Sequence, residues 1–116
     1  MKGSDVGSIT DYRSFWPVYL AAHRHPATRA LHMLGTALAS LLLIAGLVLG
    51  NGWMLLAAPI AGYAFAWLSH ALIERNRPAT FEHPLSSFVS DFRMLFLWLG
   101  GRLEGELRRQ GLDPNA

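Results

Sequence analysis

The chain has 116 residues, of which 52% are hydrophobic and only 16% are charged, and its formal net charge is +2 at pH 7. This length allows one domain, and the composition is too apolar for an ordinary soluble domain of that size, so we expect a membrane protein. The lack of cysteine excludes disulfides, thiol catalysis and thiolate-bound metal, and no extended basic face of the kind that binds nucleic acid is present.

The N-terminal part is expected to hold a loose tail and one amphipathic helix. Residues 1–9 contain Gly and Ser and predict a flexible tail. The first helix is predicted from about Asp11 to Arg24, because its large side chains recur at helical spacing. These side chains are Tyr12, Phe15, Trp16, Tyr19 and Leu20. Tyrosine and tryptophan are typical of the headgroup level, so we expect this helix to lie along the membrane interface.

The middle of the chain predicts a transmembrane hairpin. From Ala30 to Ile73 there is no Asp, Glu, Lys or Arg, and a single Asn51-Gly52 turn divides this stretch. The two helices expected on either side cover about residues 27–49 and 52–75. Each is about as long as the roughly 20 residues that cross a bilayer core, where only closed backbone hydrogen bonding is tolerated.

The basic residues set the expected orientation. All ten Lys and Arg residues fall outside the charge-free stretch, so the positive-inside rule places both chain ends in the cytoplasm. The Ala- and Arg-rich composition is typical of a bacterial protein, and the bacterial inner membrane is the expected location. Arg24, Arg29, Arg75 and Arg77 flank one mouth of the hairpin, where they can meet lipid phosphates or bind an acidic substrate.

A last helix is predicted over about residues 85–110. Its apolar part, Leu85 to Leu99, would reach only about 22 Å, which is short of a full span, so we expect it to pack obliquely or to re-enter. The predicted fold class is therefore all-α: a single membrane domain over residues 1–116, arranged as a four-helix bundle, with no oligomeric state indicated.

The five histidines gather at the cytoplasmic mouth and indicate a metal site. His32 and His70 are equally far in sequence from Asn51, so the hairpin places both imidazoles at the same depth. His70 and Glu74 are four residues apart and share a helix face, and His23 ends the first helix. Two or three histidines with one carboxylate suit non-haem Fe(II), with Mn or Zn as alternatives, and open positions on iron can bind O2 and substrate together.

Three other interpretations of these residues stay open. The histidines can be interfacial residues of a non-catalytic, lipid-binding or scaffolding membrane protein. His32 and His70 can be the two axial ligands of a haem. Glu74 can be the base of a zinc hydrolase. Asp91, near Arg93, is either a polar feature of a helix face or a hydrogen-bond partner of a ligand histidine.

Three segments resemble a known membrane family: residues 23–35 (His-Arg-His-Pro-Ala-Thr-Arg-Ala-Leu-His-Met-Leu-Gly), 69–78 and 84–94. The family, long known as a domain of unknown function, includes the fungal 2-hydroxy fatty acid dioxygenase of phytosphingosine breakdown. The resemblance implies an Fe(II)-dependent membrane enzyme that uses O2 to shorten a 2-hydroxy fatty acid by one carbon with release of CO2. It also implies His23, His32, His70 and, less directly, His83 as metal ligands, with Glu74 as the accompanying carboxylate.

Overall fold

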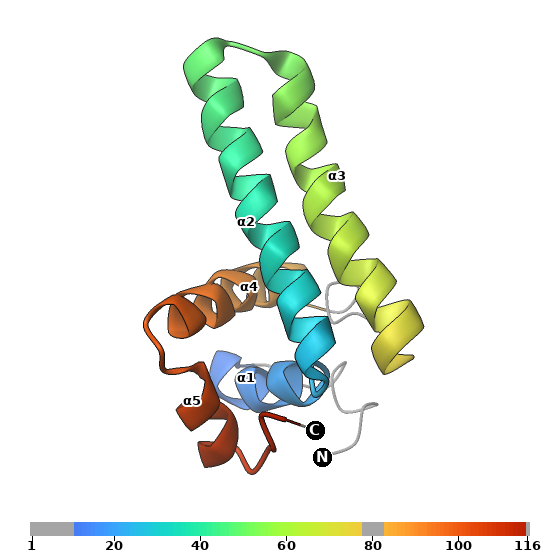
Figure 1. Cartoon of the computed structure of the whole chain (residues 1–116), viewed down its shortest axis with the longest axis vertical. Helices are drawn as coiled ribbons and strands as arrows, with labels where there is room; N and C mark the ends of the chain where they lie inside the picture. Colours follow the sequence, from blue (N-terminus) through green and yellow to red (C-terminus); the bar gives the residue numbers. More distant parts are fainter. Residues whose placement is uncertain (1–10, 78–82, 116) are drawn as a thin grey trace.

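The computed structural model describes residues 11–77 and 83–115, and within these ranges it is helical without strands. A long hairpin stands on a base of shorter helices (Figure 1). The expected tail at residues 1–9 lies outside the described residues. The elements are α1 Tyr12–Ala21, α2 Pro26–Leu49, α3 Gly52–Ser69, a π-helical turn η2 His70–Glu74, α4 Pro84–Leu99 and α5 Leu103–Arg109.

The hairpin of α2 and α3 turns where the sequence predicts it. Gly50 ends α2 with φ 64°, a left-handed conformation that costs glycine little. The side chain of Asn51 then accepts hydrogen bonds from the backbone N–H groups of Trp53 and Met54, which caps the start of α3. The predicted Asn-Gly turn is confirmed.

Small residues let the two hairpin helices approach closely. A Cβ added at Gly35 would lie 2.7 Å from the Cβ of Phe65, and one added at Gly46 would lie 2.9 Å from Leu55. Both distances are shorter than real carbon atoms show. At Gly35 the obstacle is a Cβ, so glycine is required there, whereas at Gly46 the end of the Leu55 side chain would have to move. The close contact fixes the relative height of α2 and α3 and therefore of the residues at their lower ends.

The end of α3 changes to a π-helical turn, η2, which begins at His70. Arg75 follows with φ 58°, unusual for a residue with a side chain, and its backbone N–H donates to the carbonyl of His70. The backbone N–H of Asn76 also donates to that carbonyl, at 3.0 Å. The chain thus folds back over His70, and single π-helical turns of this kind often occur at functional sites.

The aromatic stripe of α1 packs inside the protein. Phe15, Trp16, Tyr19 and Leu20 are all at most 3% exposed and form the main core cluster with residues of α4 and α5. We expected these side chains to anchor the helix at the membrane interface. The described contacts show instead that they hold α1 against the C-terminal helices, because α5 buries apolar residues such as Leu107 on them.

The C-terminal helix is divided in two, whereas the sequence analysis expected one helix to about residue 110. α4 ends at Leu99, and Gly101 then takes a left-handed conformation with φ 72° before α5 begins at Leu103. The break turns α5 back under α1, where Glu106 accepts a 2.6 Å hydrogen bond from the indole N–H of Trp16. The break therefore allows α5 to pack against α1.

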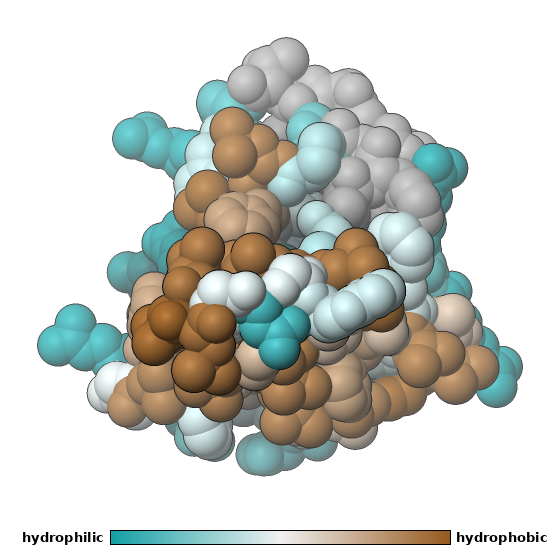
Figure 2. Space-filling view, turned by 90° about the horizontal axis from the view of Figure 1, so that it is seen from above, coloured by the Kyte–Doolittle hydropathy of each residue, from teal (hydrophilic) through white to brown (hydrophobic). Residues whose placement is uncertain are grey.

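Two helical segments are long and apolar enough to cross a membrane, Pro26–Leu49 and Gly52–Glu74. Large apolar side chains stand exposed along both, among them Leu41, Leu47 and Trp53. In Figure 2, which looks at the molecule from above, apolar residues cover much of the near face. Only 28% and 22% of the most apolar windows of these two segments are buried within the molecule.

Candidate metal centre

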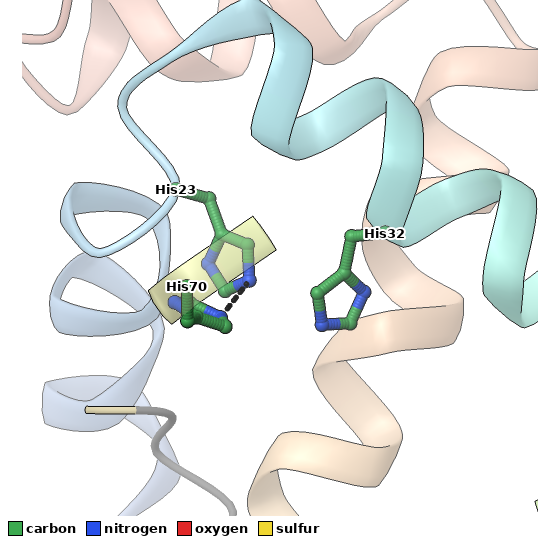
Figure 3. Close-up of side chains that lie close together, drawn as sticks. All are labelled: His23, His32 and His70. Carbon is green, nitrogen blue, oxygen red and sulfur yellow. Dashed lines mark hydrogen bonds between the residues drawn. The ribbon is translucent and has the colours of Figure 1, made fainter. Parts of the chain in front are cut away.

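Three histidines from three parts of the chain meet at the foot of the hairpin. His23 lies in the connection between α1 and α2, His32 lies in α2, and His70 begins the π-helical turn. All three are buried, and one potential ligand atom from each lies within 4.8 Å of the others. The three imidazoles face a common space (Figure 3). The group can hold a metal ion.

Hydrogen bonds from the surrounding chain fix the tautomers of two of these rings. His23 Nδ1 lies 2.7 Å from the carbonyl oxygen of Tyr19, and a carbonyl only accepts, so Nδ1 carries the proton. His70 Nδ1 lies 2.7 Å from Asn76 Oδ1, while Asn76 Nδ2 donates to the carbonyl of Ala22. His70 Nδ1 is therefore also the donor. Each Nε2 is left with a free lone pair directed into the cluster.

The two free nitrogens lie close together. His23 Nε2 and His70 Nε2 are 3.0 Å apart, and neither carries a proton to share in these tautomers. Burial, and then the neighbouring His32 and His70, lower the pKa of His23 well below its usual value, so the ring stays neutral. At metal–nitrogen distances of about 2.1 Å, two ligands at right angles are separated by about 3 Å. The donor set and its spacing thus fit a metal ion.

A carboxylate adjoins the third histidine, and it belongs to Asp91. Asp91 Oδ1 lies 3.4 Å from His32 Nε2 and accepts a 2.6 Å hydrogen bond from the hydroxyl of Tyr19. Burial raises the pKa of Asp91 to about 7, although the Tyr19 hydrogen bond opposes this rise. Burial raises the pKa of Tyr19 well above 10, so that this hydroxyl keeps its proton and donates it. The contact is of the kind expected for an Asp91 that supports a ligand histidine.

Two other predicted site residues lie outside the three-histidine group. The Glu74 side chain is 2% exposed, and its Oε2 accepts a 2.7 Å hydrogen bond from the backbone N–H of His25, at the start of α2. His83 precedes α4, and its ring packs against Phe15 with centroids 5.3 Å apart. Glu74 therefore fastens the π-helical turn to the loop that carries His23.

The four arginines of the predicted mouth divide into two kinds. Arg24, Arg75 and Arg77 are exposed. Arg29 is 5% exposed, and its guanidinium donates to the carbonyls of His23 and Arg24, both at 2.9 Å, and to that of Pro114. Arg29 thus holds the His23 loop to the C-terminal segment.

Asn76 and Tyr19 were not predicted to shape the site, and Arg29 was predicted to bind substrate and not to hold the His23 loop. Asn76 had the clearest signal, since it is an amide between two arginines directly after the expected helix end. Tyr19 appeared only as a member of an aromatic stripe. Its carbonyl and hydroxyl both serve the site, and one helical turn separates it from His23.

An apolar groove adjoins the site at Asp91. It has a volume of about 210 Å³ and lies between α2, α3 and α4. Asp91 forms part of its wall, and the rest is mainly apolar, with Leu43, Pro59, Tyr63 and Phe92 among the lining residues. One wall residue of the groove, Asp91, therefore also contacts a cluster histidine.

The sequence model of the family described as "2-hydroxy-palmitic acid dioxygenase Mpo1-like" matches residues 9–103. The chain belongs to the Mpo1-like family. The match includes all five histidines and Asp91, and it ends at the first residue of α5. No curated protein and no solved structure matches the chain. The family assignment confirms the resemblance inferred from the motifs, and in this Mpo1-like chain the described residues bring three of those histidines together.

Proposed function

We propose that this Mpo1-like protein is an Fe(II)-dependent dioxygenase of 2-hydroxy fatty acids. In the proposed reaction, the C1–C2 bond of the acid breaks and O2 is reduced. The products are a fatty acid one carbon shorter, CO2 and one water, which balances all atoms of the acid and of O2. The observation that carries the proposal is the convergence of three buried imidazoles beside an apolar groove.

The histidine group suits iron better than the haem alternative. His23 packs against both rings that would be axial ligands, with ring centroids 4.7 Å from His32 and 4.4 Å from His70. This arrangement leaves no gap for a porphyrin. Imidazole ligands with open positions are typical of non-haem iron sites, and bound Fe(II) would supply the redox chemistry that O2 requires.

The residues around the histidines would orient the site and exclude water. Asn76 and the Tyr19 carbonyl hold two rings with Nε2 toward the cluster, and Asp91 adjoins the third. We infer that Asp91 rather than Glu74 is the carboxylate closest to the reacting groups. The exposed Arg24, Arg75 and Arg77 would attract the fatty acid carboxylate to this end of the hairpin.

The groove would hold the acyl chain. Its walls come from α2, α3 and α4, and each methylene buried there would contribute about 0.8 kcal/mol to binding. We further propose that α2 and α3 cross the bacterial inner membrane with both chain ends in the cytoplasm. The groove would then open toward lipid, from which a fatty acid can enter sideways.

The direct test is turnover by purified, Fe(II)-loaded protein. Consumption of O2 with 2-hydroxypalmitic acid, and formation of the acid one carbon shorter detected by mass spectrometry, would support the proposal. Palmitic acid, which lacks the hydroxyl group, is the substrate control. The variant His70→Ala should lose both the metal, measured by elemental analysis, and turnover. Stoichiometric iron without turnover over a range of chain lengths would contradict the proposal and favour a non-catalytic lipid-binding protein.

A further inference from the structure

Two buried hydroxyl groups, one in α2 and one in α4, have no hydrogen-bond partner among the described residues. Thr28 in α2 is 0% exposed and Ser87 in α4 is 2% exposed. A buried hydroxyl without a partner destabilises a fold by about 1–3 kcal/mol. Such a group in a native protein needs a reason, and one reason is a ligand that completes its hydrogen bonds.

Other helical hydroxyls in the same chain solve this problem locally. Thr36 donates to the carbonyl of His32 at 3.1 Å, and Ser40 donates to the carbonyl of Thr36 at 2.8 Å. Bonds of this kind to the preceding helical turn are the ordinary solution. Thr28 and Ser87 lie in the first turns of α2 and α4, which begin at Pro26 and Pro84, so no preceding helical turn offers them an acceptor.

Each hydroxyl lies one helical turn from a residue of the site. Thr28 precedes His32 by one helical turn, and Ser87 precedes Asp91 by one turn. His32 and Asp91 are themselves in contact, at 3.4 Å. Along α2, the groove begins at Thr36, one turn after His32, so Thr28 and the groove lie on opposite sides of the histidine.

We propose that Thr28 and Ser87 bind the carboxylate of the 2-hydroxy acid, with the acyl chain leaving past the histidines into the groove. This inference rests on the proposed function. Two hydroxyl groups can donate to the two oxygens of a carboxylate. The buried Arg29, one residue from Thr28, is the other candidate to bind this carboxylate, but its guanidinium already donates to backbone carbonyls. Thr28 and Ser87 would thus be substrate-binding residues, satisfied only when the acid is present.

The test compares Thr28→Val and Ser87→Ala with the parent protein, each loaded with Fe(II) under anaerobic conditions. Titration calorimetry with 2-hydroxypalmitic acid should give a Kd about tenfold higher for each variant, the loss expected for one hydrogen bond to a charged group. Iron content should equal that of the parent. Without the acid, the Tm of each variant should be higher than that of the parent, because an unsatisfied hydroxyl has been removed. Ser86→Ala, which changes the neighbouring serine, is the matched control and should change neither value.

Each contrary result is decisive. An unchanged Kd, a lower Tm, or loss of iron in both variants would overturn the inference, since the hydroxyls would then have another role. If the parent binds the acid with the expected dependence on Thr28 and Ser87 but does not turn it over, the proposed reaction fails and the binding site stands. If the parent binds no 2-hydroxy acid, both fail.

Discussion

At the scale of single residues, the candidate site depends on which nitrogen of each imidazole carries a proton. The carbonyl of Tyr19 and the amide of Asn76 each occupy an Nδ1, which leaves Nε2 free on His23 and His70. Hydrogen bonds from outside the ligand set commonly determine ring orientation and ligand strength. Asn76 is the more accessible of the two for mutation, because the Tyr19 group is backbone.

Asn76→Ala should weaken metal binding by roughly 10- to 100-fold, since His70 would lose the acceptor that fixes its tautomer. Titration of the metal-free protein with Fe(II) measures this directly. Asn115→Ala, a change at an exposed asparagine far along the chain, serves as the control. Parent-like affinity in Asn76→Ala would mean that the ring is oriented by its packing alone.

Glu106 gives a prediction for the dependence of stability on pH. Burial alone would raise its pKa, but hydrogen bonds from Trp16 and Gln110 and the ion pair with Arg109 outweigh burial and hold the pKa below its usual 4.5. A lowered pKa in the folded state stabilises the fold above the unfolded pKa, and this contribution is lost as pH falls through the folded pKa. Glu106→Gln should therefore have a lower Tm than the parent at pH 7. The difference should shrink as pH falls below 4.5 and through the lowered pKa of Glu106 in thermal unfolding experiments, and a constant difference would show that the charge is not what stabilises the contact.

At the scale of elements, the hairpin was predictable and the base was not. Two apolar runs around Asn51-Gly52 leave few choices other than two packed helices, and their equal lengths place His32 and His70 together. The break between α4 and α5 was missed, although two consecutive glycines at 100–101 were its signal. The aromatic stripe of α1 has the same spacing whether it faces lipid or a protein core. Its sequence alone therefore does not predict that α4 and α5 pack on it.

Prediction from the sequence is limited in the same way for the carboxylate near the histidines. Glu74 was favoured because it shares a helix face with His70, and helix periodicity is visible in a sequence. Its side chain instead meets the N–H of His25, a contact between segments far apart in the chain. Asp91 lies beside His32 through the crossing of α2 and α4, and no spacing within one helix predicts such a crossing.

The contact of α2 with α3 yields a prediction at this scale. Gly35→Ala would place a Cβ 2.7 Å from that of Phe65 and push the helices apart. We expect a loss of stability of roughly 1–3 kcal/mol and a lower iron content, because His32 and His70 move apart with their helices. Thermal unfolding and elemental analysis measure the two effects. Gly52→Ala, at the start of α3, is the control, since its added Cβ would meet nothing within 4 Å.

At the scale of the whole molecule, Arg29 connects the site to the C-terminal segment through the carbonyls of His23, Arg24 and Pro114. Arg29→Met keeps a similar apolar stem but leaves three carbonyls without their donor. We expect roughly 3 kcal/mol of destabilisation and reduced iron content, measured on the same preparations, whereas Arg108→Met at an exposed position should resemble the parent. Full stability with weaker substrate binding would instead assign Arg29 to substrate recognition, as the sequence analysis expected.

The three histidines come from the α1–α2 connection, from α2 and from the end of α3, and no two belong to the same element. An unassembled chain therefore has no preformed site, and iron would bind the assembled chain alone. Ligand linkage then raises the ratio of folded to unfolded chain in proportion to free iron once iron exceeds its Kd. Proteases degrade the unfolded chain, so less protein would be degraded when more iron is available. The amount of this protein in a cell should accordingly follow iron supply even at a constant rate of synthesis.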